Sequence, residues 1–94
     1  MARELTRTLL LIDDEPAQRR LVAAIGARAG WRLVAVGEGE SALAQLAAQE
    51  IDAVLIDQWS PDPDGAALIA AIRRDYPTLP ILMLTALSLS LIHI

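Results

Sequence analysis

Four short runs of apolar residues divide the chain, and each run is continuous rather than alternating with polar residues. Continuous apolar runs are typical of strands buried on both faces, as in a parallel sheet. The predicted strands cover residues 8–12, 32–36, 53–56 and 81–84. Their lengths fit strands better than helices, so the runs predict four strands of one sheet.

Helical patterns separate these runs. The first helix is predicted to begin near Pro16 and to end at Gly30, because proline favours the first position of a helix and glycine its end. The second is predicted from about Glu40, and the third from a cap at Asp64–Gly65 to a point before Pro77. The predicted apolar stripes are Leu21, Val22, Ile25 and Ala29 in the first helix, Leu43, Leu46 and Ala47 facing inward in the second, and Leu68, Ile69 and Ile72 facing inward in the third.

Strands that alternate with helices predict an α/β fold with a parallel sheet and right-handed crossovers. In such sheets ligands bind beyond the carboxyl ends of the strands. Asp13 and Asp14 follow the first predicted strand, Asp57 follows the third and Thr85 the fourth. If the first and third strands are neighbours, these side chains converge. Carboxylates in such a group repel one another, and oxygen ligands alone favour a hard cation, so we predict a Mg²⁺ site.

Each of these residues also has a structural explanation. Asp13 and Asp14 are suited to capping the following helix, and Asp57 is suited to the turn after a strand. Thr85 alone is a common type of strand-end residue. A cap requires only one acid, however, and does not account for Asp57. The set as a whole therefore favours the cation site.

Composition narrows the possible functions. The 94 residues are enough for one domain, and without cysteine neither a disulfide nor a thiolate metal site can form. The net charge is −4, and all the basic residues are arginines scattered along the chain, which argues against nucleic-acid binding by this segment. No apolar run has the length of a membrane span and no secretory leader begins the chain, so a cytoplasmic location is expected.

Three segments carry a family resemblance. "LLLIDDEP", "AVLIDQWSPDPDG" and "ILMLTA", together with their spacing, resemble the receiver domains of two-component response regulators, including the single-domain chemotaxis receiver, over roughly residues 7–86. The resemblance implies a flavodoxin-like, doubly wound parallel sheet with strand order 2-1-3-4. It also implies phosphorylation by a sensor histidine kinase or a phosphotransfer protein, with Mg²⁺ as cofactor.

The same resemblance implies a role for each site residue. Asp57 is the phosphoacceptor and a metal ligand, Asp14 binds Mg²⁺ directly, and Asp13 acts largely through water. The backbone carbonyl of Trp59 completes the protein ligands, and Thr85 is the switch hydroxyl.

The sequence also departs from the family pattern. Gln58 and Ser60 replace residues that are usually apolar, and Trp59 is bulky, so we expect altered rates of phosphoryl transfer. The family's fourth helix, fifth strand with its lysine, and fifth helix have no counterpart. We interpret residues 7–88 as a C-terminally truncated, partial receiver domain. Residues 89–94, "LSLIHI", match the translation of a transposon-end adapter used in sequencing libraries, so we expect this tail to be non-native.

Three functions remain in view. The favoured one is a phosphorylation-controlled switch that is not itself an enzyme, with an output that the sequence does not identify but that in this family is most commonly transcription regulation. The alternative is a non-phosphorylated pseudo-receiver that docks other proteins. A phosphatase similar to haloacid dehalogenases would need an acid two positions beyond Asp57, where this chain has Trp59.

Overall fold

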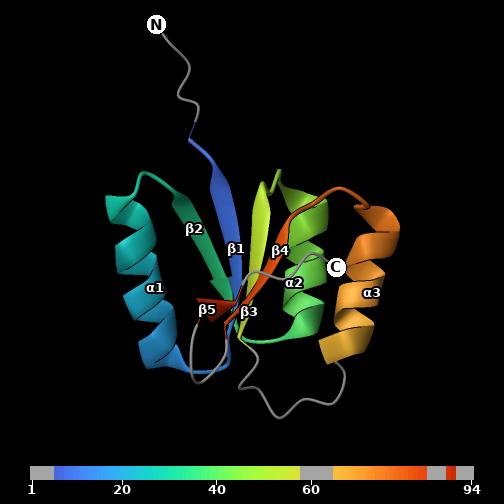
Figure 1. Ribbon diagram of the computed structural model, residues 1–94, viewed down its shortest axis with the longest axis horizontal. Coiled ribbons are helices and arrows are strands. Elements are labelled where there is room, and N and C mark those ends of the chain that lie inside the picture. The colour runs from blue at the N-terminus through green and yellow to red at the C-terminus, as the bar shows by residue number, and fades with distance from the viewer. Residues whose placement is uncertain (1–5, 58–64, 85–88, 91–94) are drawn as a thin grey trace, which may run out of the picture.

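The fold is a parallel sheet between helices, as the computed structural model shows for residues 6–57, 65–84 and 89–90. The elements, in chain order, are β1 (Thr8–Ile12), α1 (Pro16–Arg28), β2 (Arg32–Val36), α2 (Gly39–Ala48), β3 (Ala53–Asp57), α3 (Gly65–Asp75) and β4 (Ile81–Leu84). The strands β2, β1, β3 and β4 are neighbours in that order, and each of these pairs is parallel. Figure 1 shows α1 on one face of the sheet and α2 and α3 on the other. The predicted α/β fold with strand order 2-1-3-4 is therefore confirmed.

The main core lies between the sheet and the pair α2 and α3. Alternate residues of a strand point to the same face, and those facing these helices are buried. The buried members of this cluster are Leu10, Ile12, Val54, Ile56 and Ile81 from the strands, Ala42 and Leu46 from α2, and Ile69 and Ile72 from α3. The hydroxyl of Tyr76 donates a hydrogen bond to the carbonyl of Leu46 at 3.1 Å, which joins the end of α3 to α2. The inward direction predicted for the third helix is thus confirmed.

The opposite face of the sheet packs against α1. The contact is close at Gly26, where a Cβ atom would lie 3.3 Å from Cδ1 of Leu33 in β2. No residue of α1 is buried, however, and Leu21 and Ile25 are 60% and 59% exposed. The apolar stripe predicted for this helix therefore lies largely on the surface of the described structure.

The predicted inward face of α2 is wrong in part. Leu46 is buried as expected, but Leu43 and Ala47 are exposed, and Ala42 is fully buried. Residues four apart share one side of a helix, and α2 packs through the row of Ala42 and Leu46. The helix is therefore rotated by about one residue from the predicted orientation.

The prediction that every strand is buried on both faces is wrong for β2. Arg32 and Ala35 are exposed, and the other three residues of this strand are only partly buried. The cause is position: β2 is an edge strand whose one strand neighbour is β1. Edge strands have water along one side, so a continuous apolar run does not by itself guarantee burial.

A short fifth strand was not predicted. β5 (Leu89–Ser90) pairs antiparallel with β4, with Met83 opposite Ser90 and Leu84 opposite Leu89. The predicted third strand also extends one residue further, through Asp57. The predicted cap at Asp64 and the greater part of the predicted tail, residues 91–94, lie outside the described residues.

Two glycines, one in α1 and one just after it, should respond in opposite directions to alanine. Gly30 has φ of 89°, where an L side chain is strained, so Gly30→Ala should lower the free energy of unfolding by about 1 kcal/mol. Gly26 is helical, and the nearest atom to an added Cβ is the end of the flexible Leu33 side chain. Gly26→Ala should therefore raise the free energy of unfolding by about 0.5–1 kcal/mol through helix propensity. Urea unfolding followed by tryptophan fluorescence checks both, and equal effects would contradict the backbone argument.

Candidate functional site

The carboxyl ends of the parallel strands meet at one edge of the sheet, on the lower side of Figure 1. In the register of β1 with β3, Ile12 pairs with Ile56. Asp13 is the residue after Ile12, and Asp57 is the residue after Ile56. On its other side the backbone of Asp57 pairs with Leu84. The backbones of Asp13 and Asp57 therefore lie at equivalent positions of neighbouring strands, which confirms that the first and third strands are adjacent.

Asp13 is held from several directions. Its side chain is buried, with 1% exposure for the residue, and its Oδ1 accepts a hydrogen bond from the amide of Glu15 at 2.9 Å. Its amide donates to the carbonyl of Val36 at 3.0 Å, at the end of β2. Its carbonyl accepts from Nη1 of Arg19 at 2.7 Å. Burial of a carboxylate costs free energy unless hydrogen bonds or a positive charge compensate it. Here one carboxylate oxygen accepts a hydrogen bond, and two further hydrogen bonds fix the backbone of Asp13.

The capping explanation for the acid pair does not agree with the structure. The N-cap residue of α1 is Glu15, no side chain forms a hydrogen bond as a cap there, and Pro16 is the first residue of the helix. Asp13 instead bonds to the amide two residues ahead, in the manner of an Asx turn. Asp14, next to it, is exposed at the edge of the sheet. The pair is therefore placed beyond the strand rather than on the helix end.

The chemistry of this edge fits a hard cation. Asp13 and Asp14 supply carboxylates, and the backbone of Asp57 lies beside that of Asp13. The side chains of the predicted site residues Asp57, Trp59 and Thr85 lie outside the described part of the structure, as do Gln58 and Ser60. Among the side chains that the structure describes, no three histidine, cysteine or acidic residues gather. The site of three carboxylates thus stays a prediction.

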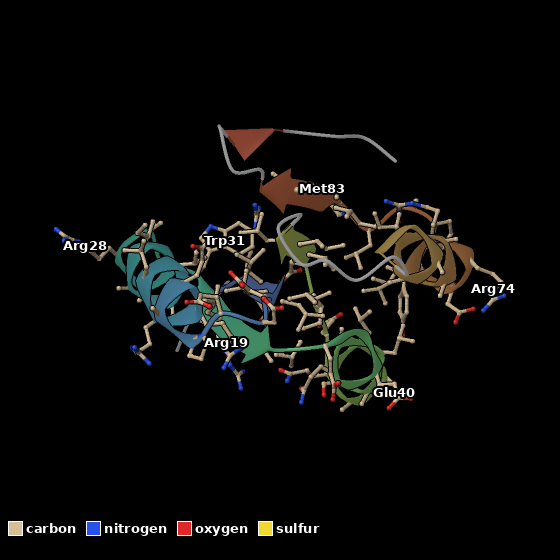
Figure 2. The ribbon with its side chains drawn as sticks, turned by 90° about the horizontal axis from the view of Figure 1, so that it is seen from below. Arg19, Arg28, Trp31, Glu40, Arg74 and Met83 are labelled. Atoms are coloured by element: carbon tan, nitrogen blue, oxygen red, sulfur yellow. The ribbon has the colours of Figure 1, made fainter. Side chains whose placement is uncertain are left out.

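Arg19 is a residue of this edge that the sequence did not single out. It lies in the first turns of α1, and its guanidinium reaches back to the carbonyl of Asp13. A Cβ atom on Gly37, just after β2, would lie 3.4 Å from its Nη1. Figure 2 shows Arg19 between α1 and the end of β2. The side chain therefore bonds to the segment that follows β1 and lies beside the segment that follows β2.

Comparisons with known proteins agree with this geometry. The family model for the response regulator receiver domain matches residues 9–90. The crystal structure of the response regulator protein TrrA from Thermotoga maritima, in complex with Mg²⁺ and BeF, has a TM-score of 0.78. It is 28% identical, and the match covers 86% of this chain and 70% of that one.

Two curated relatives match over nearly the same region. TcrX of Mycobacterium tuberculosis, by its name a transcriptional regulatory protein, is 37% identical over 79 residues, which are 84% of this chain and 34% of TcrX. The sensor histidine kinase RcsC of Escherichia coli is 37% identical over 82 residues, which are 87% of this chain and 9% of RcsC. The chain thus spans about a third of TcrX and under a tenth of RcsC. Within the described residues, no helix has the length and apolarity needed to cross a membrane.

Proposed function

Because the chain belongs to the response regulator receiver family, we propose that it is the phosphoacceptor switch of a cytoplasmic two-component system. Asp57 takes a phosphoryl group from the phosphohistidine of a sensor histidine kinase or a phosphotransfer protein. The observation that carries this proposal is the register that sets the backbone of Asp57 beside buried Asp13 at the carboxyl edge. Neighbouring carboxylates at that edge suit a cation and a phosphoryl group together.

The proposed reaction is a direct transfer between the donor and the aspartate. A carboxylate oxygen of Asp57 forms a bond to phosphorus while the bond from phosphorus to the donor imidazole breaks, and the imidazole, which keeps the proton on its other ring nitrogen, leaves as a neutral group. Bound Mg²⁺ would neutralise charge on the phosphoryl oxygens. Asp14 and Asp13 would hold the metal, together with Asp57 and the carbonyl of Trp59. Thr85 would donate its hydroxyl to a phosphoryl oxygen and shift the conformational equilibrium.

The test uses the chain itself, a small phosphodonor and the metal. Incubation with acetyl phosphate and Mg²⁺, followed by intact-mass measurement, should show one added phosphoryl group. Chelation of the metal should prevent the addition. If no adduct forms under any condition, the phosphoacceptor proposal fails and the pseudo-receiver alternative takes its place.

Magnesium binding gives a second measurement. Mg²⁺ should raise the thermal unfolding midpoint, because a ligand that binds only the folded state stabilises it, by about 2.7 kcal/mol at a hundred times its Kd. Asp14→Asn should remove most of this increase, since an amide is a poorer ligand than a carboxylate. Asp75→Asn is the control, because Asp75 is exposed at the far end of α3 and its ion pair with Arg74, at 4.0 Å, contributes little. An equal response of both variants to Mg²⁺ would exclude Asp14 as a ligand.

The output of the switch is proposed from the relatives alone. TcrX is named as a regulator of transcription, and RcsC is a sensor histidine kinase that contains a matching segment. We propose transcription regulation, with DNA binding performed by a separate output domain. The scattered arginines of this chain support that separation, because they form no basic stripe in the sequence.

A further inference from the structure

We propose that Arg19 is a positioning residue for the acidic pair Asp13 and Asp14. Its guanidinium holds the backbone carbonyl of Asp13, and so fixes the direction in which the two carboxylates leave the end of β1. The inference rests on the proposed function in one respect, namely that the two carboxylates bind Mg²⁺. The contacts of Arg19 and its charge lead to opposite predictions for metal affinity, which makes the proposal testable.

The contacts of Asp13 show which restraint Arg19 supplies. The Asp13 amide is held by β2, through the carbonyl of Val36 at 3.0 Å, and the Asp13 Oδ1 is held by the Glu15 amide at 2.9 Å. The carbonyl is the group that begins the link to Asp14, and it is held by Nη1 of Arg19 at 2.7 Å. That distance is at the short end for hydrogen bonds with a charged donor, which are about twice as strong as neutral ones. Arg19 therefore restrains the peptide that connects the two acids.

The backbone of Arg19 is fixed in α1, and the tip of its side chain lies beside Gly37. At its base, the Arg19 amide donates to the carbonyl of Glu15 at 3.0 Å. At its tip, Nη1 lies beside Gly37, where a Cβ atom would be 3.4 Å away, at van der Waals contact. Arg19 is partly buried, whereas its neighbour Arg20 is exposed. The same residue type at the next position thus offers a matched control.

Charge and position act on magnesium affinity with opposite signs. A guanidinium repels a nearby dication, so removal of its charge alone should tighten Mg²⁺ binding. Removal of a positioning contact should weaken Mg²⁺ binding. Mutation of residues that orient metal ligands commonly lowers metal affinity by about 10–100-fold. The direction of the change therefore separates the two roles.

Isothermal titration with MgCl₂ alone measures this direction. Arg19→Met should weaken Mg²⁺ binding about tenfold. Arg20→Met, which removes the same charge from an exposed site, should leave the affinity unchanged or slightly higher. Arg19→Lys keeps the charge, on a compact ammonium group in place of the planar guanidinium, and should recover part of the loss. Unchanged or tighter binding by Arg19→Met would overturn the proposal.

Amide hydrogen exchange without metal supplies an independent readout. Arg19→Met should speed exchange at the amides of Asp14 and Glu15, while the amides of Leu10 and Val54 in the core strands stay protected and show that the variant is folded. Gly37→Val, which keeps Arg19 but adds bulk beside its guanidinium, should act in the same direction. If the unmodified chain binds no Mg²⁺, the proposed function loses its metal, and exchange alone decides on Arg19. Unchanged exchange at Asp14 and Glu15 would overturn the positioning role.

Discussion

Leu10→Ala should lower the free energy of unfolding by about 2–5 kcal/mol, a large share of the total stability of a small domain. Leu10 is fully buried in the middle of β1, where it pairs with Val34 on one side and Val54 on the other. A smaller side chain would leave a cavity between strands that are held in register, so the site could not collapse easily. Urea unfolding gives the change as a lower midpoint at an unchanged m-value.

Leu21→Ala is the matched control, because it makes the same chemical change at a surface site. Leu21 is 60% exposed on α1, so its truncation should change stability by less than about 0.5 kcal/mol. Alanine also has a slightly higher helix propensity than leucine, which offsets part of any loss. A loss for Leu21→Ala as large as that for Leu10→Ala would mean that the exposed face of α1 is buried in solution. Little effect of Leu10→Ala would contradict the core described here.

The strands could be predicted from the sequence because parallel strands in a covered sheet are apolar without interruption. The predicted bounds agree with β1, β2 and β4, and the third strand is one residue longer than predicted. The predicted burial on both faces was wrong for the edge strand β2. The run of β2 has the same apolar character as the others, but its position in the sheet leaves Arg32 and Ala35 exposed. Strand order is a property of the whole fold, and no local pattern reports it.

Helix orientation was harder to predict than helix position. In α2 nearly every position is apolar or small, so several stripes are possible, and packing chose Ala42 and Leu46 instead of Leu43 and Ala47. In α3 the large apolar residues are Leu68, Ile69 and Ile72, the other early positions are glycine and alanine, and Ile69 and Ile72 are buried as predicted. The pairing of β5 with β4 involves two residues only, which is too short for any periodicity to indicate.

The part of the candidate site that could be predicted from the sequence is the part that lies at strand ends. Asp13 and Asp57 lie at equivalent ends of adjacent strands, as the sequence predicted. Arg19 was not predictable in the same way, because its partner is a backbone carbonyl and every residue has one. A sequence pattern can indicate side chains that act together in one site, such as several carboxylates around a cation. It does not indicate a side chain whose partner is a backbone group.

Asp57→Ala should remove the phosphoryl adduct completely. The expected loss is total because a methyl group offers no oxygen nucleophile, and the neighbouring carboxylate of Asp13 is buried and bonded to the amide of Glu15. Asp75→Ala is the matched control: it removes an exposed aspartate at the far end of α3 and should leave the adduct intact. Intact mass after incubation with acetyl phosphate and Mg²⁺ compares the two variants.

The outcomes separate the chemistry from the fold. Loss of the adduct in Asp57→Ala alone, with unchanged circular dichroism, assigns the phosphoacceptor. An adduct that survives Asp57→Ala and maps by peptide mass to Asp13 or Asp14 would make the assignment of Asp57 wrong while keeping the acidic edge as the site. An adduct that survives elsewhere on the chain would remove the edge as well. The register of β1 and β3 sets the backbones of Asp57 and Asp13 side by side, and only the first outcome assigns the switch to Asp57.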